Sequence, residues 1–345
     1  MRKCKGCGAI LQYEDRDKPG YAPDESFEYC QRCFRLTHYG DISGLKKSLK
    51  DNKEVIEYYK EVKDALFVLI VDVFDGMILD QDRLLDHFKD RRVLLAINKT
   101  DLLPRNITEA KINEIYADTL KAYKDDENIE CVLTQKGDHT FSDLFFEILE
   151  ESGYKKAVFV GRTNAGKSTL INKLCRNEDL TISVYPGTTI GFNEIRSGEY
   201  TFIDTPGLLD EESVLTYIDN SKINSILPLK TIKAQNFQVY DGQSYSIEGL
   251  IAVDVKPYEE CSITFMINNN LEVHRTKLAN AENYLERNKD GFKLKLLPFA
   301  DNRCRIDKLN TFIIKGLGLF KIKGKCEVNI RVNDRIKVYK NEVNV

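Results

Sequence analysis

The chain has 345 residues, of which 42% are hydrophobic and 30% charged, and its formal net charge is −3. This composition excludes a disordered or fibrous chain and predicts a folded protein of two or three domains. The longest apolar run, residues 66–73 with Asp72 near its end, is far shorter than the roughly 20 residues that span a bilayer. The start of the chain lacks the pattern of a signal peptide, so we expect a cytoplasmic protein without a membrane partner.

Two cysteine pairs open the chain. Cys4-Lys-Gly-Cys7 and Cys30-Gln-Arg-Cys33 are C-x-x-C motifs, and each such turn can place two sulfurs on one side of a zinc ion. Residues 1–48 are therefore predicted to form a treble-clef-like zinc knuckle. Four cysteine ligands leave no coordination position open, so the expected site is structural. The alternative is four unrelated buried thiols.

A guanine-recognition loop is predicted next. Residues 93–97 form an expected strand, and Asn98-Lys-Thr-Asp101 follows it. Asp101 can accept hydrogen bonds from guanine N1–H and the exocyclic amine, Asn98 can meet the O6/N7 edge, and the stem of Lys99 can lie on the purine face. Adenine would not offer Asp101 the matching N–H donors. A site whose polar groups are left unpaired in this way rejects the wrong base. On its own the motif could also be an exposed polar turn.

A second base-contacting loop is predicted after the strand at residues 130–133. Thr134-Gln-Lys136 resembles the backbone loop that donates an N–H to guanine O6, with Gln135 in place of the usual small residue. A helix is expected over residues 141–151, and residues 152–155 join it to the next strand.

The phosphate-binding loop is the most specific motif. A predicted strand at residues 156–160 leads into Gly161-Arg-Thr-Asn-Ala-Gly-Lys-Ser168, which matches G-x-x-x-x-G-K-[ST], and a predicted helix over residues 167–175 follows. Backbone N–H groups of such a loop converge on phosphates at a helix N-terminus. Lys167 is expected to reach the β- and γ-phosphates, and Ser168 to bind Mg²⁺. The expected nucleotide contacts in this loop are Gly161, Asn164, Ala165, Gly166, Lys167, Ser168 and Thr169.

Two further segments complete the predicted site. Tyr185-Pro-Gly-Thr-Thr189 lies where a switch loop is expected, and Thr189, with Thr188 as the alternative, is predicted to contact Mg²⁺ and the γ-phosphate. A strand over residues 200–204 precedes Thr205-Pro-Gly207. Asp204 is expected to hold Mg²⁺, and the Gly207 N–H to sense the γ-phosphate. Lys167, Thr189 and Gly207 are the predicted catalytic groups.

The order of these motifs is reversed relative to the usual GTPase. The guanine loops precede the phosphate loop, which predicts a circular permutation of one mostly parallel α/β sheet across residues 49–220. Permutation is tolerated where chain ends are close and exposed. The new end falls in residues 208–220, the second switch segment, so the C-terminal domain is attached to an element that should respond to the γ-phosphate.

Residues 221–345 are predicted to form a basic, β-rich α+β domain. From Ser225 to Val345 there are 20 Lys and Arg against 14 Asp and Glu, a net of +6. This charge is consistent with RNA or ribosomal-protein contact, and a solvated face of Lys-rich strands is the alternative. A helix is expected over residues 276–288. The expected strands are 249–255, 261–267, 271–275, 293–297, 311–314, 319–322, 327–332 and 335–339. Phe299, Phe312, Phe320 and Tyr339 are better suited to core packing than to base stacking.

Together, C-x-G-C, C-Q-R-C-F-R-L-x-H-Y, N-K-x-D, G-x-x-N-x-G-K-S-x-L-I-N, P-G-T-T, D-T-P-G and Gly316-Leu-Gly-Leu-Phe320 resemble the YqeH family of circularly permuted GTPases. The resemblance implies a Ras-like fold that uses GTP/GDP, Mg²⁺ and Zn²⁺. It also implies a role in assembly of the small ribosomal subunit, with rRNA or ribosomal proteins as partners of a monomer.

Two residues refine the expected reaction. Leu208 stands where Ras-like enzymes carry a water-positioning glutamine, so slow intrinsic hydrolysis is expected. Asn164 resembles the asparagine by which potassium-activated GTPases hold K⁺, an ion that could stabilise transition-state charge. The alternative is that Asn164 only fits the turn of the loop. A binding scaffold with structural nucleotide, and a GTPase with a non-ribosomal partner, remain alternatives.

Overall fold

The computed structural model describes residues 2, 4, 9–16, 18, 20–31, 33, 34, 52–123, 126–135, 139–175 and 192–341. The chain forms two compact units. The first unit contains Met1–Asp72, Arg83–Thr100 and Tyr123–Asp210, and the second contains Val73–Asp82, Asp101–Ala122 and Glu211–Val345. Each unit therefore combines segments that are far apart in the sequence.

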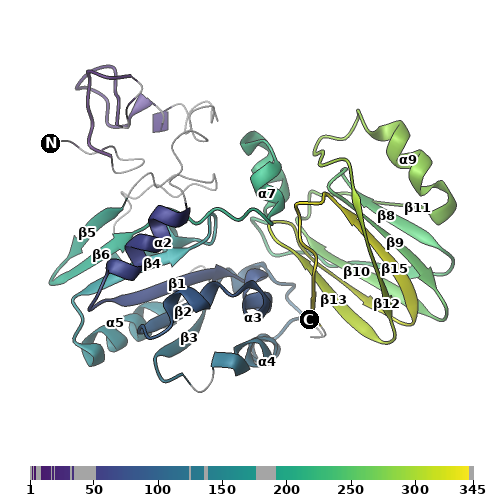
Figure 1. The fold of residues 1–345 in the computed structure, drawn as a ribbon, viewed down its shortest axis with the longest axis horizontal. Coiled ribbons are helices and arrows are strands. Elements are labelled where there is room, and N and C mark those ends of the chain that lie inside the picture. The colour runs from purple at the N-terminus through teal and green to yellow at the C-terminus, as the bar shows by residue number, and fades with distance from the viewer. Residues whose placement is uncertain are drawn as a thin grey trace. The chain divides into compact units, whose positions relative to one another are not determined.

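A six-stranded sheet forms the centre of the first unit (Figure 1). Its strands are β1 (Leu66–Asp72), β2 (Val93–Asn98), β3 (Ile129–Thr134), β4 (Lys156–Gly161), β5 (Asn193–Ser197) and β6 (Tyr200–Asp204). They lie in the order β3-β2-β1-β4-β6-β5, and every neighbouring pair is parallel except β5 and β6. The residues of β1, β2 and β4 are almost all buried, as expected for parallel strands covered on both faces.

Helices cover the two faces of this sheet. The helical segments of the unit are α2 (Asn52–Glu61), η2 (Leu84–Phe88), α5 (Thr140–Ser152) and α6 (Lys167–Cys175). Buried residues of α5 and α6, such as Phe145 and Leu170, cluster with Phe159 of β4 on one face. On the opposite face Tyr59 of α2 and Phe88 of η2 pack with Phe67, with ring centroids 5.5 to 6.3 Å apart. The alternation of side chains along β1 produces this division, since Phe67 points away from Leu66 and Val68.

A small cluster forms the N-terminal part of the first unit. Cys4, Leu11, Ala22, Cys30 and Cys33 are buried together, and Gln12 makes a short parallel bridge with Tyr21. A core this small rarely supplies much folding free energy on its own, so it is suited to stabilisation by a metal.

The second unit contains two five-stranded antiparallel sheets. One has the order β16-β13-β14-β10-β7 and the other β11-β8-β9-β15-β12. Their strands are β7 (Gln235–Val239), β8 (Gln243–Ile247), β9 (Ile251–Pro257), β10 (Cys261–Ile267), β11 (Val273–Lys277), β12 (Ala300–Ile306), β13 (Leu309–Ile314), β14 (Gly318–Lys323), β15 (Cys326–Val332) and β16 (Tyr339–Asn341). Residues of both sheets, including Phe265, Phe320, Val255 and Val328, share one buried core.

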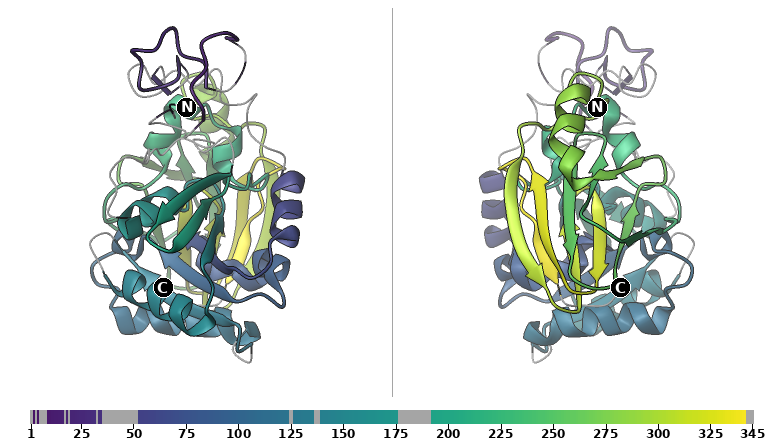
Figure 2. Two further views of the ribbon diagram at one scale, coloured as in Figure 1. Left: turned by 90° about the vertical axis from the view of Figure 1, so that its left-hand side faces the viewer. Right: turned by 90° about the vertical axis from the view of Figure 1, so that its right-hand side faces the viewer.

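Short helices accompany these sheets. They are η1 (Asp75–Ile78), α3 (Leu79–Asp82), α4 (Glu109–Thr119), α7 (Val214–Tyr217), η5 (Asn220–Lys222), α8 (Ile223–Ile226), η6 (Leu278–Asn280) and α9 (Ala281–Asn288), while η3 (Thr100–Leu102) and η4 (Leu120–Tyr123) begin or end at the unit boundary. Helix α9 lies at one end of the second sheet (Figure 2), where Glu282 pairs with Arg331 and Tyr284 stacks on His274.

The structure corrects several predicted elements of this region. Residues 293–297 and 335–338 are not strands, and residues 276 and 277 belong to β11 rather than to a helix. Leu294 and Leu296 are buried in an alternating pattern, but alternation reports burial and not strand pairing. Strand β12 was not predicted, because its exposed Arg303 and Arg305 are typical of a charged edge strand.

Among the helices of the described residues, none has both the length and the apolar character needed to cross a bilayer.

Candidate nucleotide-binding site

The phosphate loop begins at the carboxyl end of β4 and leads into α6. Gly161 has φ +145°, and a Cβ there would lie 2.2 Å from the Ile70 carbonyl oxygen of β1. A side chain at this position would therefore clash with backbone, which explains the glycine. The loop lies at the end of the sheet where two neighbouring strands diverge: β1 is followed by β2 on one side, and β4 is followed by β5 and β6 on the other. Open α/β sheets bind ligands at such a switch point.

Lys167 points back into this loop. Its Nζ donates to the carbonyl oxygens of Gly161 and Arg162, each at 3.0 Å, and its side chain is buried. Burial lowers the pKa of Lys167 to about 8, while the nearby Asp204 carboxylate opposes the shift. Phosphate oxygens can replace the two carbonyl acceptors, and the ammonium would then neutralise phosphate charge.

The two described residues predicted to hold Mg²⁺ lie together. Ser168 Oγ donates to Asp204 Oδ2 at 3.1 Å, because β6 pairs with β4 and places Asp204 beside Phe159. A hydroxyl and a carboxylate oxygen are ligands that a hard divalent cation accepts. Thr188 and Thr189, predicted to complete this site, lie outside the described residues.

The D-T-P-G segment pairs with the phosphate loop. Leu208 N donates to the Gly161 carbonyl at 3.1 Å, and Thr163 N donates to the Leu208 carbonyl at 3.0 Å. A Cβ on Gly207 would lie 2.8 Å from Thr163 Cγ2, so this position also needs glycine. The Leu208 side chain is 5% exposed. It is apolar and buried, and therefore cannot orient a water molecule.

The first guanine-recognition residues are hydrogen-bonded to the same loop. Asn98 Nδ2 donates to the Ala165 carbonyl at 2.9 Å, and Lys99 Nζ donates to the Asn164 carbonyl. A Cβ on Gly166 would lie 2.2 Å from Asn98 Nδ2. The structure thus brings Asn98 and Lys99 together with residues 164–166.

The other residues predicted to contact the base differ in their exposure. Asp101 follows Thr100 along the chain and is exposed. Thr134 is buried and its carbonyl accepts a hydrogen bond from Thr100 Oγ1 at 3.3 Å, while Gln135 is exposed. Lys136 lies outside the described residues.

Three of the four predicted zinc ligands form a cluster. The sulfurs of Cys4, Cys30 and Cys33 all lie within 4.8 Å of one another, and all three residues are buried. The Cys30 N–H points at Cys4 Sγ at 3.0 Å, a hydrogen bond that stabilises a thiolate. This set of three sulfurs could bind zinc. Cys7, the predicted fourth ligand, lies outside the described residues.

Three contacts around the site carried no recognisable sequence signal. Arg162 Nη1 pairs with Asp210 Oδ2 at 2.6 Å, although Arg162 occupies a variable position of the loop motif. Asn52 contacts the backbone of Leu209, 157 residues away, and the Tyr59 hydroxyl contacts Thr205. An asparagine at the start of a helix predicts only a cap.

Comparison with known proteins gives consistent results. A protein-family model described as MMR_HSR1, 50S ribosome-binding GTPase, matches residues 156–278. The protein named uncharacterized protein YqeH from Bacillus subtilis is 31% identical over 90% of this chain and 88% of its own length. NO-associated protein 1 from Arabidopsis thaliana is 25% identical over 82% of this chain, and GTPase Der from Buchnera aphidicola is 26% identical over 63%. The chain spans 60% and 52% of the lengths of these last two.

Proposed function

The chain belongs to the YqeH family of GTPases, and from this premise we propose that it is a GTP-controlled factor in assembly of the small ribosomal subunit. The GTPase domain implies hydrolysis of GTP to GDP and phosphate with Mg²⁺ as the cofactor. The observation that carries the proposal is the hydrogen-bonded set of Lys167, Ser168, Asp204 and Asn98 around one loop. Cytoplasmic location and the domain limits 1–48, 49–220 and 221–345 are parts of the proposal.

Each residue has a role in the proposed reaction. Lys167 neutralises charge on the β- and γ-phosphates, and the Gly207 N–H donates to a γ-phosphate oxygen. Ser168 and Asp204, with Thr189, would hold Mg²⁺, and the ion would supply positive charge beside the phosphates. Asn98, Lys99 and Asp101 orient the guanine. Hydrolysis is slow in the isolated protein because Leu208 cannot position the attacking water.

The sheet order supports a circular permutation. If the chain were cut before β4 and its ends joined, the strands would run β4, β5, β6, β1, β2, β3, with the phosphate loop first and the guanine loops last. That is the usual GTPase order. The observed neighbours β3-β2-β1-β4-β6-β5 are unaffected by where the chain begins, so one Ras-like sheet accommodates both orders.

Contacts within the second unit support coupling between the second switch segment, residues 208–220, and the β-sandwich that the two five-stranded sheets form. Lys315 is 1% exposed, and its Nζ pairs with Asp82 at 2.6 Å and Glu212 at 2.9 Å. The Val214 N–H donates to the Lys315 carbonyl at 3.0 Å. A Cβ on Gly316 would lie 2.5 Å from Ser213 Oγ. Residues 212–214, which follow D-T-P-G closely, are therefore fixed to the Lys-Gly turn between β13 and β14.

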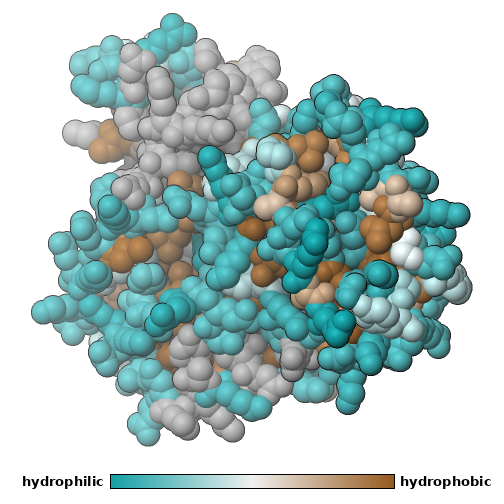
Figure 3. Space-filling model, turned by 45° about the vertical axis from the view of Figure 1, so that its right-hand side comes forward, coloured by the Kyte–Doolittle hydropathy of each residue, from teal (hydrophilic) through white to brown (hydrophobic). Residues whose placement is uncertain are grey.

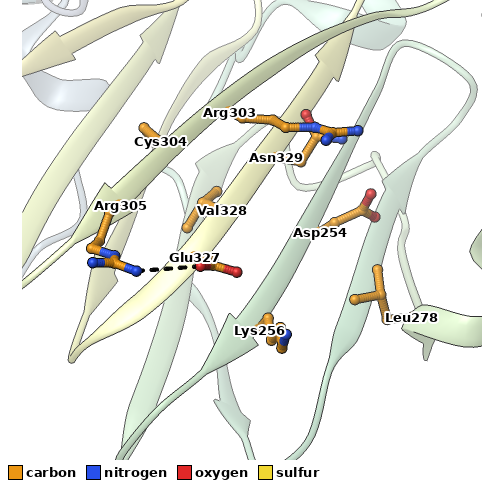
Figure 4. A pocket seen from close by; sticks show the side chains of 9 residues that line it. All are labelled: Asp254, Lys256, Leu278, Arg303, Cys304, Arg305, Glu327, Val328 and Asn329. Atoms are coloured by element: carbon orange, nitrogen blue, oxygen red, sulfur yellow. Dashed lines mark hydrogen bonds and ion pairs between the residues drawn. The ribbon is translucent and has the colours of Figure 1, made fainter.

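The surface of the second unit suits a polar partner. The face drawn in Figure 3 is mostly hydrophilic, with hydrophobic residues in separate groups. A groove on β9, β15 and β12 is lined by Lys256, Arg303 and Arg305, and also by Asp254 and Glu327 (Figure 4). Arg305 pairs with Glu327 at 3.5 Å, an exposed ion pair of small energy that a phosphate could replace. Together with the net charge of +6, these residues support RNA contact.

Sedimentation of the full chain with purified ribosomal subunits tests the proposal. We expect co-migration with the small subunit that is stronger with a non-hydrolysable GTP analogue than with GDP. The description of the matched family model names the 50S subunit, so the large subunit is an arm of the experiment. Binding to the large subunit alone would overturn the small-subunit assignment. Equal binding to the subunits in all nucleotide states would indicate a scaffold. Binding to neither subunit would indicate a partner other than the ribosome.

A further inference from the structure

Helix α2 lies beside the D-T-P-G segment although more than 140 residues separate them in the chain. The Asn52 side chain makes two hydrogen bonds to the backbone of Leu209: Nδ2 donates to the Leu209 carbonyl at 2.7 Å, and Oδ1 accepts from the Leu209 N–H at 2.8 Å. A paired amide of this kind fixes both the position and the orientation of the Leu209 backbone.

A second contact holds the other side of Gly207. The Thr205 hydroxyl donates to the Phe159 carbonyl at 2.7 Å, so its oxygen accepts from the Tyr59 hydroxyl at 3.0 Å. Tyr59 is 2% exposed, and burial raises its pKa, so the hydroxyl stays protonated as a donor. Residues two before and two after Gly207 are thus both tied to α2.

The path of the chain gives these contacts a meaning. Strand β6 ends at Asp204, and five residues later Leu209 is hydrogen-bonded to Asn52, the first residue of α2. Helix α2 ends at Glu61, and β1 begins soon afterwards at Leu66. Strands β6 and β1 are parallel and lie on either side of β4. Two parallel strands of one sheet are ordinarily joined by a helical crossover. Here α2 occupies the place of that crossover helix, and two hydrogen bonds replace the covalent link.

We propose that α2 is the detached second half of the second switch, and that Asn52 and Tyr59 are positioning residues that hold Gly207 for contact with the γ-phosphate. Helix α2 also contacts Phe192, three positions after the Pro-Gly-Thr-Thr segment, since Tyr58 stacks on Phe192 with ring centroids 4.0 Å apart. The inference rests on the proposed GTP-dependent function.

The test compares binding and turnover in full-length variants. Asn52→Ala removes both hydrogen bonds to Leu209, and Tyr59→Phe removes one hydroxyl while keeping the ring in place. Asn52→Asp keeps an acceptor for the Leu209 N–H but turns a carboxylate oxygen toward the Leu209 carbonyl, so it should act in the same direction as Asn52→Ala. Glu57→Ala, an exposed residue on the same helix, is the matched control. Affinities for GDP and for a non-hydrolysable GTP analogue, kcat and the thermal midpoint are measured for each.

The expected result is selective loss of the triphosphate state. Asn52→Ala should lower affinity for the GTP analogue and kcat by about tenfold, the effect of one or two net hydrogen bonds, with GDP affinity changed by less than about twofold. Tyr59→Phe should act in the same direction. Equal losses for both nucleotides, or unchanged values, would overturn the inference. If Asn52→Ala fails to fold, Asn52→Asp and Tyr59→Phe decide. A wild-type chain that does not distinguish GTP from GDP would instead refute the proposed function.

Discussion

The Nδ2 atom of Asn98 lies 2.9 Å from the carbonyl oxygen of Ala165. This bond joins the last residue of β2 to the loop after β4, although β1 lies between the two strands in the sheet. The carboxyl ends of parallel strands share one edge, so motifs written in reversed order along the chain meet in space. A single nucleotide can therefore contact both loops, and the position of each motif in the sequence is irrelevant to the chemistry.

Asp101→Asn tests recognition of guanine. In the predicted contact the carboxylate would accept two N–H groups of the base, whereas an amide could accept one and would present an N–H to the other. GTP affinity should fall by about 100-fold or more, since hydrogen bonds to a charged group are each worth roughly 1.5–3 kcal/mol. Xanthosine triphosphate, which carries an oxygen in place of the amine, should bind the variant better than GTP. Competition binding measures both, and unchanged GTP affinity would contradict the assignment.

Lys167 predicts a specific dependence of stability on pH. Burial lowers the pKa of its amine to about 8, against about 10.4 in an unfolded chain. Between these two pKa values the folded state binds fewer protons than the unfolded state. Burying the charged amine therefore costs folding free energy below pH 8, and this cost falls as the pH rises. The free energy of unfolding of the nucleotide-free protein should gain up to about 1.4 kcal/mol per pH unit from this residue above pH 8. Chemical denaturation gives the slope of the unfolding free energy against pH for wild type and for Lys167→Met. Identical slopes for the two proteins would refute the prediction.

Much of the first unit was predictable because its motifs and strands obey local rules. The strands β2, β4 and β6 are short apolar runs that end at polar loops, and their predicted limits agree with the structure to within one residue. Backbone requirements at Gly161 and Gly166 follow from the loop motif itself. The positions of the nucleotide and metal contacts were predicted from chemistry, and they stay predictions until ligands are bound.

The remainder depended on contacts that no local pattern encodes. The Asn52–Leu209 and Lys315–Asp82 pairs join residues 157 and 233 positions apart. In the β-sandwich, burial alternates in segments that pair with nothing, as at Leu294 and Leu296, so periodicity overpredicted strands there. The charged edge strand β12 shows the opposite error, since exposure hid a paired strand.

Lys315→Met should strongly destabilise the second unit. The change leaves Asp82, whose side chain is 3% exposed, without its buried cation, and breaking a buried pair on one side costs about 3–5 kcal/mol. The free energy of unfolding from urea titration measures the loss. Lys337→Met is the matched control, because Lys337 is 50% exposed and 3.9 Å from Glu212, and it should change stability by less than about 0.5 kcal/mol. Adding Asp82→Asn to Lys315→Met should recover part of the loss. A single variant as stable as wild type would refute this account.

The cysteine cluster predicts one zinc ion per chain. Elemental analysis of the purified protein should show that ratio, and Cys30→Ser or Cys33→Ser should remove the metal, because serine is a poor replacement for a thiolate ligand. Cys7→Ser tests the predicted fourth ligand. Cys175→Ser, in α6, should retain zinc. Full metal content in the Cys33→Ser protein would contradict a zinc site built on these sulfurs.

Asn164 predicts stimulation of hydrolysis by potassium. Its backbone has φ +64°, and its side-chain oxygen and nitrogen are buried without a hydrogen-bond partner among the described residues. A buried carbonyl oxygen beside the phosphate loop is a suitable ligand for a large monovalent cation, whose charge would stabilise the transition state. Wild-type kcat should therefore rise at least about tenfold from NaCl to KCl at equal ionic strength, with little change in GDP affinity. RbCl, whose cation is similar in size to K⁺, should substitute in part.

In the Asn164→Ala protein, NaCl and KCl should give equal rates, because the ion loses its ligand while Lys167 and Ser168 still bind the phosphates and Mg²⁺. A wild-type rate that is the same in NaCl and KCl would exclude the role, and stimulation that persists in Asn164→Ala would place the ion elsewhere.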